Sequence, residues 1–382
     1  MDRRHFLSVA GTTTALAGCV GAAAALNRPE SDGSASRDER QPKRRPMRRP
    51  MRMHVGTQRK PTSPEILQFV KRHGVDHVCG YPPDPGERGY WTVEDLEKTR
   101  DLCEQHGVTL DIVALPFLKS SHIDREERGA IMLGKSPERE RDIEHINIMT
   151  ANCAKVGIPC WKYNMSLLGV LRTESTPGRG GSSYSTWKLA DAKADPPLTR
   201  AGRVSEDEVW ERITYFLDRV IPVCNEYKVR AACHPHDPGV PKSGWQGLPR
   251  VLGTVDGLKK LVSIQDSPYH GLNLCLGSVA EGLQNPRAEI NDVIRWFGER
   301  RKIFNIHYRN IRGRRDDFQE VYLDNGELDM LGMLRTLYEV DYQYMVMPDH
   351  VPRHPDDPGG RQGFAFAYGY IKALMQAVES DA

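Results

Sequence analysis

The hydrophobic and polar positions of this 382-residue chain repeat in a regular order from Met51 onward. Short apolar runs, typical of buried strands, are followed by polar loops and then by longer segments with apolar residues at steps of three and four, typical of amphipathic helices. We therefore predict eight strands separated by helices. The predicted strands cover residues 52–57, 76–80, 109–114, 160–165, 229–233, 272–275, 303–307 and 342–347.

Capping residues mark where several of the helices begin. Ser63 is followed by Pro64, the order expected for an N-cap and the first helical residue. Thr92 and Ser205 each precede an acidic residue three positions later, which predicts a capping box. The predicted helices cover residues 63–74, 92–106, 137–156, 206–227, 255–264, 291–300, 329–339 and 366–377.

Eight strands that alternate with helices at intervals of roughly 30–45 residues are typical of an α/β fold of the TIM-barrel, or (β/α)8, type. We predict one such domain over residues 52–382. The alternative is an open doubly wound sheet, which requires a glycine-rich turn after the first strand. Gly56-Thr57-Gln58-Arg59 does not supply that turn. A long loop over residues 173–197 is expected to be functional or disordered.

The N-terminal residues predict export rather than part of the fold. Residues 1–26 begin with Arg3-Arg4-His5-Phe6-Leu7 and continue with small and apolar residues, which resembles a twin-arginine (Tat) signal. Leu16-Ala17-Gly18-Cys19 resembles a lipobox, so Cys19 is a candidate lipid anchor; the alternative is an ordinary cleavage near residues 22–25. The expected location is periplasmic, either free or as a membrane-anchored lipoprotein. Residues 27–51 predict a disordered basic linker.

Composition narrows the class of protein further. A formal net charge of +2 leaves no basic surplus for nucleic-acid binding, and 39% hydrophobic with 27% charged residues suits a soluble globular domain. Of eight cysteines, seven lie beyond the signal, and none forms a CxxC pair. This odd number argues against a disulfide framework.

Four residues that commonly bind metals follow or end consecutive predicted strands: His234, Cys275, His307 and Asp349. In a (β/α)8 barrel the C-terminal strand ends meet at one rim, where the active site lies. Alone, each histidine could be structural, Cys275 a core residue and Asp349 a helix cap. Their recurrence at four strand ends favours a divalent-metal site. Thiolate and imidazole favour zinc or iron, while the carboxylate admits manganese.

The motifs around these residues resemble, in order, those of the mannonate dehydratase family, a group of xylose-isomerase-like TIM barrels. The resemblance covers roughly residues 53–377. It implies a hydro-lyase of carbohydrate metabolism (glucuronate catabolism) that converts D-mannonate to 2-keto-3-deoxy-D-gluconate and water with Mn2+, or alternatively Fe2+. The family's metal ligands fall on the same four residues. The motifs are His234-Pro235-His236-Asp237-Pro238, Cys275-Leu276-Gly277-Ser278, His307-Tyr308-Arg309-Asn310, Phe318-Gln319-Glu320, Gly326-Glu327-Leu328-Asp329-Met330 and Pro348-Asp349-His350.

The resemblance also suggests roles for residues beside the metal ligands. His350 is the expected catalytic acid/base, and the candidates for substrate binding are Arg309, Arg312, His236 and Asp237. Two positions depart from the family pattern: His236 replaces an aspartate, and Phe364 stands where the family has a catalytic tyrosine. Tyr368, or Tyr370, from the following turn is the expected replacement.

Two other functions stay open at this point. A metal-dependent sugar isomerase or epimerase would use the same barrel and ligands without loss of water. A catalytically silent, exported carbohydrate-binding protein would explain both Phe364 and the export signal. The expected partner in the leading hypothesis is a small sugar acid, and a homo-oligomer is as open as a monomer.

Overall fold

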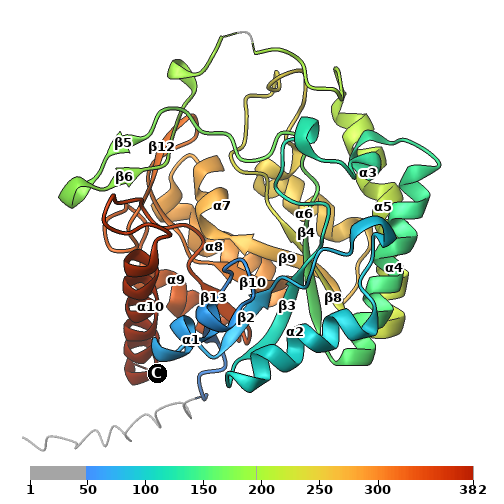
Figure 1. Cartoon of the computed structure of the whole chain (residues 1–382). Helices are drawn as coiled ribbons and strands as arrows, with labels where there is room; N and C mark the ends of the chain where they lie inside the picture. The colour runs from blue at the N-terminus through green and yellow to red at the C-terminus, as the bar shows by residue number, and fades with distance from the viewer. Residues whose placement is uncertain (1–48, 195, 382) are drawn as a thin grey trace, which may run out of the picture. The chain divides into compact units, whose positions relative to one another are not determined.

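In the computed structural model, which describes residues 49–194 and 196–381, eight parallel strands close into a barrel surrounded by helices (Figure 1). The strand order around the barrel is β1-β13-β10-β9-β8-β4-β3-β2, with the first and last strands paired. This closure confirms the predicted (β/α)8 barrel and rules out the open sheet. The barrel strands are β1 (His54–Thr57), β2 (His77–Gly80), β3 (Thr109–Ala114), β4 (Cys160–Asn164), β8 (Arg230–His234), β9 (His270–Cys275), β10 (Ile303–His307) and β13 (Met345–Met347).

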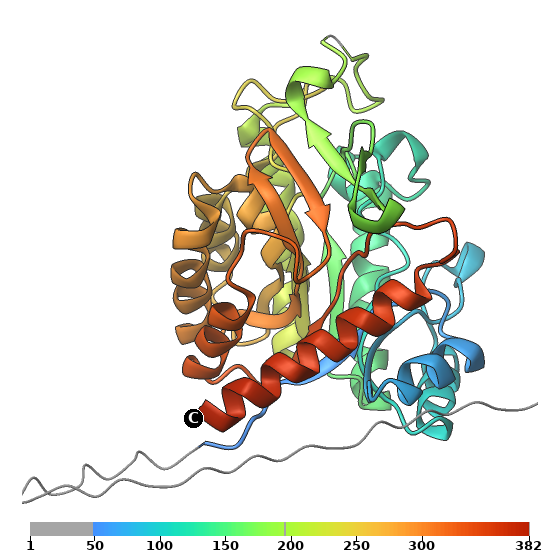
Figure 2. The same ribbon diagram turned by 90° about the vertical axis from the view of Figure 1, so that its left-hand side faces the viewer.

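Three helices begin at the predicted capping residues, whereas the helices predicted over 291–300 and 366–377 begin five residues earlier, at Pro286 and Arg361. Ser63 caps α1, and Thr92 and Ser205 form the capping boxes of α2 and α5. Figure 2 shows α10 lying along the outside of the barrel. The helices are α1 (Pro64–Arg72), α2 (Val93–Gln105), α3 (Ala130–Leu133), α4 (Glu138–Val156), α5 (Glu206–Tyr227), α6 (Val255–Ile264), α7 (Leu276–Gly282), α8 (Pro286–Glu299), α9 (Met330–Glu339) and α10 (Arg361–Asp381).

Short strands outside the barrel are the main difference from the prediction. The segment predicted as a loop over 173–197 contains β5 (Thr176–Pro177), β6 (Ser183–Tyr184) and β7 (Thr186–Lys188). β7 pairs with a hairpin of β11 (Asn310–Arg314) and β12 (Asp317–Val321). The hairpin turns at Asp316, whose φ of 69° is a conformation that aspartate tolerates better than most residues. The hairpin and α7 both lie in segments that the pattern of apolar positions assigns to polar loops between a strand and the next helix.

Small and flexible apolar side chains from six of the barrel strands form a cluster separate from the larger core beneath the helices. Since side chains alternate across a strand, this second cluster fills the barrel interior. Gly56 leaves the space that the side chain of Met345 occupies, because a Cβ there would lie 2.5 Å from its sulfur. The cluster consists of Cys79, Ile112, Ala114, Cys160, Ala232, Phe304, Met345 and Met347.

The predicted export signal, Cys19 and most of the predicted linker lie outside the described residues. Arg49, within that linker, is described: it donates to the carbonyl oxygens of Tyr338 and Glu339 at the end of α9. Within residues 49–194 and 196–381, no helix has the length and apolar character that a membrane span requires. The seven cysteines of this part are all free and buried.

Candidate metal centre

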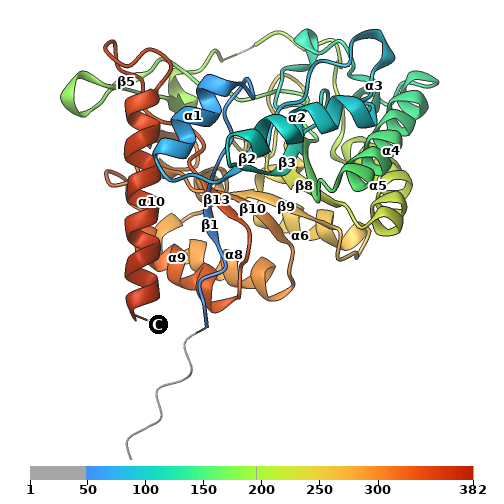
Figure 3. The same ribbon diagram turned by 60° about the horizontal axis from the view of Figure 1, so that its bottom comes forward.

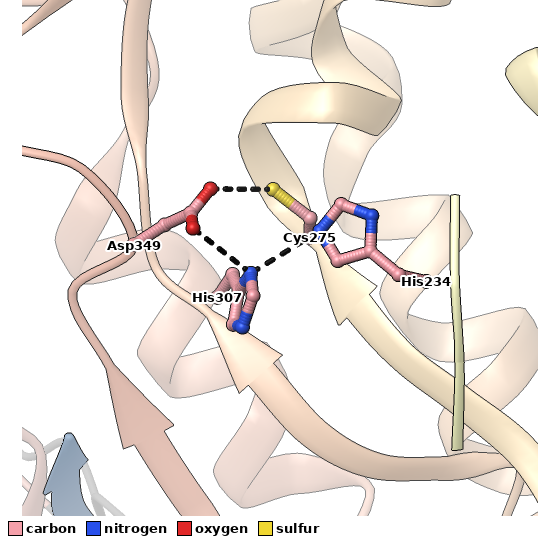
Figure 4. Close-up of side chains that lie close together, drawn as sticks. All are labelled: His234, Cys275, His307 and Asp349. Atoms are coloured by element: carbon pink, nitrogen blue, oxygen red, sulfur yellow. Dashed lines mark hydrogen bonds and ion pairs between the residues drawn. The ribbon is translucent and has the colours of Figure 1, made fainter. Parts of the chain in front are cut away.

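The four strand-end residues meet at one point of the barrel rim (Figure 4). One ligand atom from each of His234, Cys275, His307 and Asp349 lies within 4.8 Å of all the others. His307 Nδ1 is 3.2 Å from His234 Nε2 and 3.2 Å from Asp349 Oδ1, and Cys275 Sγ is 3.5 Å from Asp349 Oδ2. The structure therefore brings together the four residues that the strand-end pattern selected.

Local structure orients two of these side chains. His234 is the last residue of β8, and its Nδ1 lies 2.6 Å from the carbonyl oxygen of Pro235. That contact places the ring proton on Nδ1 and leaves the Nε2 lone pair facing the cluster. Cys275 ends β9 and is the N-cap of α7, where the amide of Ser278 donates to its sulfur at 3.4 Å. Such a donor at a helix N-terminus favours the thiolate.

Burial and charge give the cluster the donor set of a cation site. Burial, with a contribution from His307, lowers the pKa of His234 to about 3, and burial also lowers the pKa of His307, so both imidazoles are neutral near pH 7. Burial raises the pKa of the Cys275 thiol well above its usual range. Burial opposes ionisation of Asp349, but His350, His307 and Arg309 outweigh it and hold its pKa well below the usual range. Two neutral nitrogens, a carboxylate and a thiol that needs a nearby cation to ionise fit a divalent metal.

A buried network of charges lies behind the cluster. Arg309, 1% exposed, donates to Asp349 Oδ2 at 3.1 Å, to Asp237 Oδ2 at 2.9 Å and to Glu281 Oε1 at 2.5 Å. Arg172 pairs with Asp237 and with Glu320. If Asp349 moved away, Arg309 would lose one of its buried partners, which is costly. The network therefore holds Asp349 in its position.

His350, whose side chain is 45% exposed, lies beside the cluster. Its Nδ1 lies 2.7 Å from Glu320 Oε2 and its Nε2 lies 3.6 Å from Asp349 Oδ1. Burial lowers the pKa of His350, but the carboxylates of Asp349 and Glu320 outweigh that effect and raise the pKa to about 9. Glu320 lies on β12, in the hairpin that the sequence pattern did not predict, so its role as partner of His350 was missed.

The residues predicted to bind substrate do not present free donors. Arg309 and Asp237 pair with each other inside the buried network. His236 lines the cavity at the cluster, yet both of its ring nitrogens are used: Nε2 lies 2.9 Å from the carbonyl oxygen of Met165, and Nδ1 accepts from the amide of Leu252.

Arg312 is exposed on β11 and donates to the carbonyl oxygen of Asn325 at 2.8 Å. It does not line the cavity at the cluster. Its position and the internal pairing of Arg309 do not favour the predicted substrate contacts.

The tyrosine predicted to replace the missing family residue is turned away from the site. Tyr368 is fully buried, and its hydroxyl lies 2.5 Å from Thr57 Oγ1. Tyr370 stacks on Phe366, and the guanidinium of Arg59 lies 4.3 Å from the ring centroid of Phe364. None of these aromatic residues of α10 lines the cavities described next, because the helix turns these side chains toward other neighbours.

Two connected cavities open onto the cluster. A small one of about 80 Å³ is lined by three of the candidate ligands and by His350, and a larger one of about 650 Å³ adjoins it. They share Gln58, Ser120, Lys162 and Asn164 among their lining residues. Tyr81, which directly follows β2, lines the larger cavity.

Lys162 and Tyr81 are two ionisable residues of these cavities that sequence reasoning did not identify. Lys162 is buried on β4, and its ammonium forms no hydrogen bond or ion pair with any other residue that the structure describes. Burial lowers its pKa, an effect that Cys79, Asp349 and Cys275 oppose. Burial raises the pKa of Tyr81, and the nearby Cys79 and Asp349 raise it further. A lysine inside a strand pattern carries no motif, and Tyr81 was assigned to a loop.

A closed parallel barrel with an imidazole, thiol and carboxylate cluster at its C-terminal rim has the architecture of a metal-dependent barrel enzyme. Residues 193–381 match the family model described as D-mannonate dehydratase (UxuA). Mannonate dehydratase 2 of Halalkalibacterium halodurans is 27% identical over 84% of this chain and 97% of its own length, and mannonate dehydratase of Thermotoga neapolitana is 28% identical over 82% and 93%. The chain is thus similar to mannonate dehydratases over most of its length, as the motifs indicated.

A solved structure supports the fold independently. The crystal structure of mannonate dehydratase from Streptococcus suis serotype 2 has a TM-score of 0.75 to this chain at 23% identity, and the match covers 86% of this chain and 94% of that one.

Proposed function

We propose that this protein is a metal-dependent sugar-acid dehydratase that removes water from D-mannonate to give 2-keto-3-deoxy-D-gluconate. The observation that carries this proposal is the convergence of His234, Cys275, His307 and Asp349 within 4.8 Å, beside an exposed His350. The match to the dehydratase family selects the reaction among those that such a site could perform.

The four clustered residues would hold the divalent ion, with Mn2+ as the first candidate and Fe2+ as the second. When bound, this ion supplies Lewis-acid stabilisation of the negative charge that develops beside the substrate carboxylate. Arg309 holds Asp349 in position from behind. The neutral imidazoles and the carboxylate suit Mn2+ and Fe2+ alike.

Lys162 is the proposed binding group for the substrate carboxylate. A buried ammonium without an anionic partner in the described chain is costly, and an incoming carboxylate would remove that cost. Lys162 lines both cavities, so a substrate bound to it in the larger cavity also reaches the cluster.

His350 and Tyr81 are the proposed proton carriers. Glu320 holds Nδ1 of His350, so Nε2 is the nitrogen that exchanges a proton with the substrate. A cation held by Asp349 would offset the charge of that carboxylate, one of the two that raise the pKa of His350, so more of His350 would be unprotonated and able to accept the proton. The phenol of Tyr81 keeps its proton, because burial raises its pKa, and donates it to the departing hydroxyl.

Incubation of the purified protein with Mn2+ and a panel of aldonic acids tests the reaction by mass spectrometry. We expect a 2-keto-3-deoxy acid, one water lighter than its substrate, with D-mannonate preferred. His350→Asn should reduce kcat by about 10²–10⁴-fold while keeping the metal content. The matched control His354→Asn, at a histidine outside both cavities, should retain activity. Interconversion of sugars without loss of water, or no product from any acid, would refute the proposal.

We also propose, from residues 1–26 alone, that the protein is exported by the twin-arginine route. Replacement of Arg3-Arg4 by two lysines should retain the protein in the cytoplasm. Mass spectrometry of the mature N-terminus decides between acylated Cys19 and cleavage near residues 22–25. Recovery of unprocessed wild-type protein in the cytoplasm would contradict export.

A further inference from the structure

A second group of metal-binding residues lies at the opposite end of the barrel, far along the strands from the rim cluster. His54 and His77 are the first residues of β1 and β2, and Asp111 lies near the start of β3. These strands are neighbours in the order β1-β2-β3. Figure 3 turns this end of the barrel, where the chain enters β1, toward the viewer. We call His54, His77 and Asp111 the base triad.

The ligand atoms of the base triad converge on one point. His54 Nε2 lies 3.1 Å and His77 Nδ1 lies 2.9 Å from the same oxygen, Asp111 Oδ2. One atom from each residue lies within 4.8 Å of the other two. Bond lengths of about 2.0–2.2 Å in a tetrahedral site separate the ligand atoms by about 3.4 Å. Only a small outward movement is therefore needed to admit an ion.

Two features of the base triad point to a shared cation rather than to hydrogen bonding alone. A nitrogen of each imidazole contacts the same carboxylate oxygen, Asp111 Oδ2. The other oxygen, Asp111 Oδ1, has no hydrogen-bond partner among the residues that the structure describes. The two rings also lie close together and tilted, with centroids 3.6 Å apart and planes inclined by 32°. Two imidazolium rings at that separation repel each other, whereas two neutral rings that bind one cation do not.

The base triad is open to solvent, as an exchangeable site must be. His54 and His77 line a cavity of about 310 Å³, whose lining also includes Asp76 and Glu379. The side chains of His54 and His77 are 29% and 28% exposed, so a metal ion and its remaining water ligands have a path in. Lys372 lines the same cavity and donates to the carbonyl oxygen of Gly74, and the two carboxylates offset its charge.

We propose that the base triad binds a divalent transition-metal ion, with Zn2+ as the best match, at an exchangeable site independent of the rim cluster. Two imidazole nitrogens and one carboxylate oxygen are a common zinc ligand set, with water in the fourth position. Because the three ligands come from three neighbouring strands, the bound ion would tie β1, β2 and β3 together and stabilise the folded barrel.

Anomalous diffraction at the zinc edge, from crystals of the wild-type protein soaked in ZnCl2, tests this site without any mutation. We expect one peak at the rim cluster and a second among His54, His77 and Asp111. Titration of the full chain with Zn2+ against a chromophoric chelator should give about two bound equivalents. His77→Gln should remove one equivalent, together with the rise in Tm that this equivalent produces.

His73→Gln is the matched control, because His73 caps α1 close by but is not part of the triad. It should keep two equivalents. His77→Gln should also keep its dehydratase activity with Mn2+, which separates failure of this inference from failure of the proposed function. Absence of the second anomalous peak, or two equivalents retained in both His77→Gln and His54→Asn, would overturn the proposal. His54, His77 and Asp111 would then be linked by hydrogen bonds alone.

Discussion

The two ends of this barrel carry similar metal-binding residues in very different surroundings. At the rim, His234, Cys275 and His307 are buried, and Asp349 is held by Arg309 from a network of paired charges. At the base, His54, His77 and Asp111 are partly exposed and bond mainly to one another. Two cavities, of about 80 and 650 Å³, share the unpaired Lys162 beside the rim cluster, whereas a cavity of about 310 Å³ that opens to solvent adjoins the base triad.

This difference explains why one end is suited to chemistry and the other to stability. A buried site with low local dielectric strengthens every charge interaction with a substrate, and a surrounding network fixes the geometry. An exposed site offers neither advantage, but a cation there can still join neighbouring strands. The comparison predicts that changes at the rim alter turnover, while changes at the base alter stability.

The largest expected effect is that of Cys275→Ala. Loss of the thiolate should weaken metal binding and reduce kcat/KM by about 10³-fold or more, which corresponds to about 4 kcal/mol of transition-state stabilisation. Metal content and steady-state kinetics measure both quantities. Cys233→Ala, at a buried cysteine outside the cluster, is the control and should retain activity. Wild-type turnover by Cys275→Ala would remove the rim from the mechanism.

Tyr81→Phe and Tyr368→Phe should have different effects, because Tyr81 lines the larger cavity whereas Tyr368 is buried against Thr57. Tyr81→Phe should lower kcat by about 10²-fold, because the proposed proton donor is lost. Tyr368→Phe should leave kcat within about twofold but cost about 1 kcal/mol of unfolding free energy, since only its hydrogen bond to Thr57 is removed. Rate assays and denaturant titrations measure these values. The reverse pattern would restore Tyr368 as the catalytic residue.

Lys162→Met should act mainly on substrate binding. Loss of a charged hydrogen-bond donor costs about 1.5–3 kcal/mol, so KM for the aldonate should rise about 10–100-fold. Lys119→Met changes an exposed lysine that lines only the larger cavity and should have a much smaller effect. Equal KM values for both variants would contradict the assignment of Lys162.

The smallest expected effect is that of Asp111→Asn on stability without metal. Burial raises the pKa of Asp111, but hydrogen bonds from His54 and His77 outweigh it and lower the pKa below its usual value. Its stabilising contribution, about 1 kcal/mol, should therefore be present above about pH 4 and lost as the pH falls further. Denaturant unfolding of both proteins in chelator, at several pH values, measures it. If the difference in unfolding free energy between the wild type and Asp111→Asn grew as the pH fell, the predicted pH dependence would be contradicted.

The sequence predicted the barrel and the rim cluster because both depend on local order along the chain. Strand-end positions of His234 and His307 follow directly from the apolar runs. Glu320 belongs to one of the recognised motifs, but no role followed from it, and Lys162 and Tyr81 were not identified. The importance of these residues arises from a hairpin, a strand interior and a loop that only the folded structure brings to the site. His54 and His77 were placed correctly in strands, but nothing in their spacing indicated that Asp111 would join them.

The most direct test is to add Mn2+ back to metal-free protein while following product formation from D-mannonate. Activity should be absent in chelator, rise with added Mn2+ and reach its maximum once the rim cluster is filled, whether or not the base triad is occupied, because the base triad takes no part in turnover. His307→Ala should remain inactive at every metal concentration. Equal rates with and without metal, or full activity in His307→Ala, would contradict the assignment of the rim cluster as the catalytic metal site.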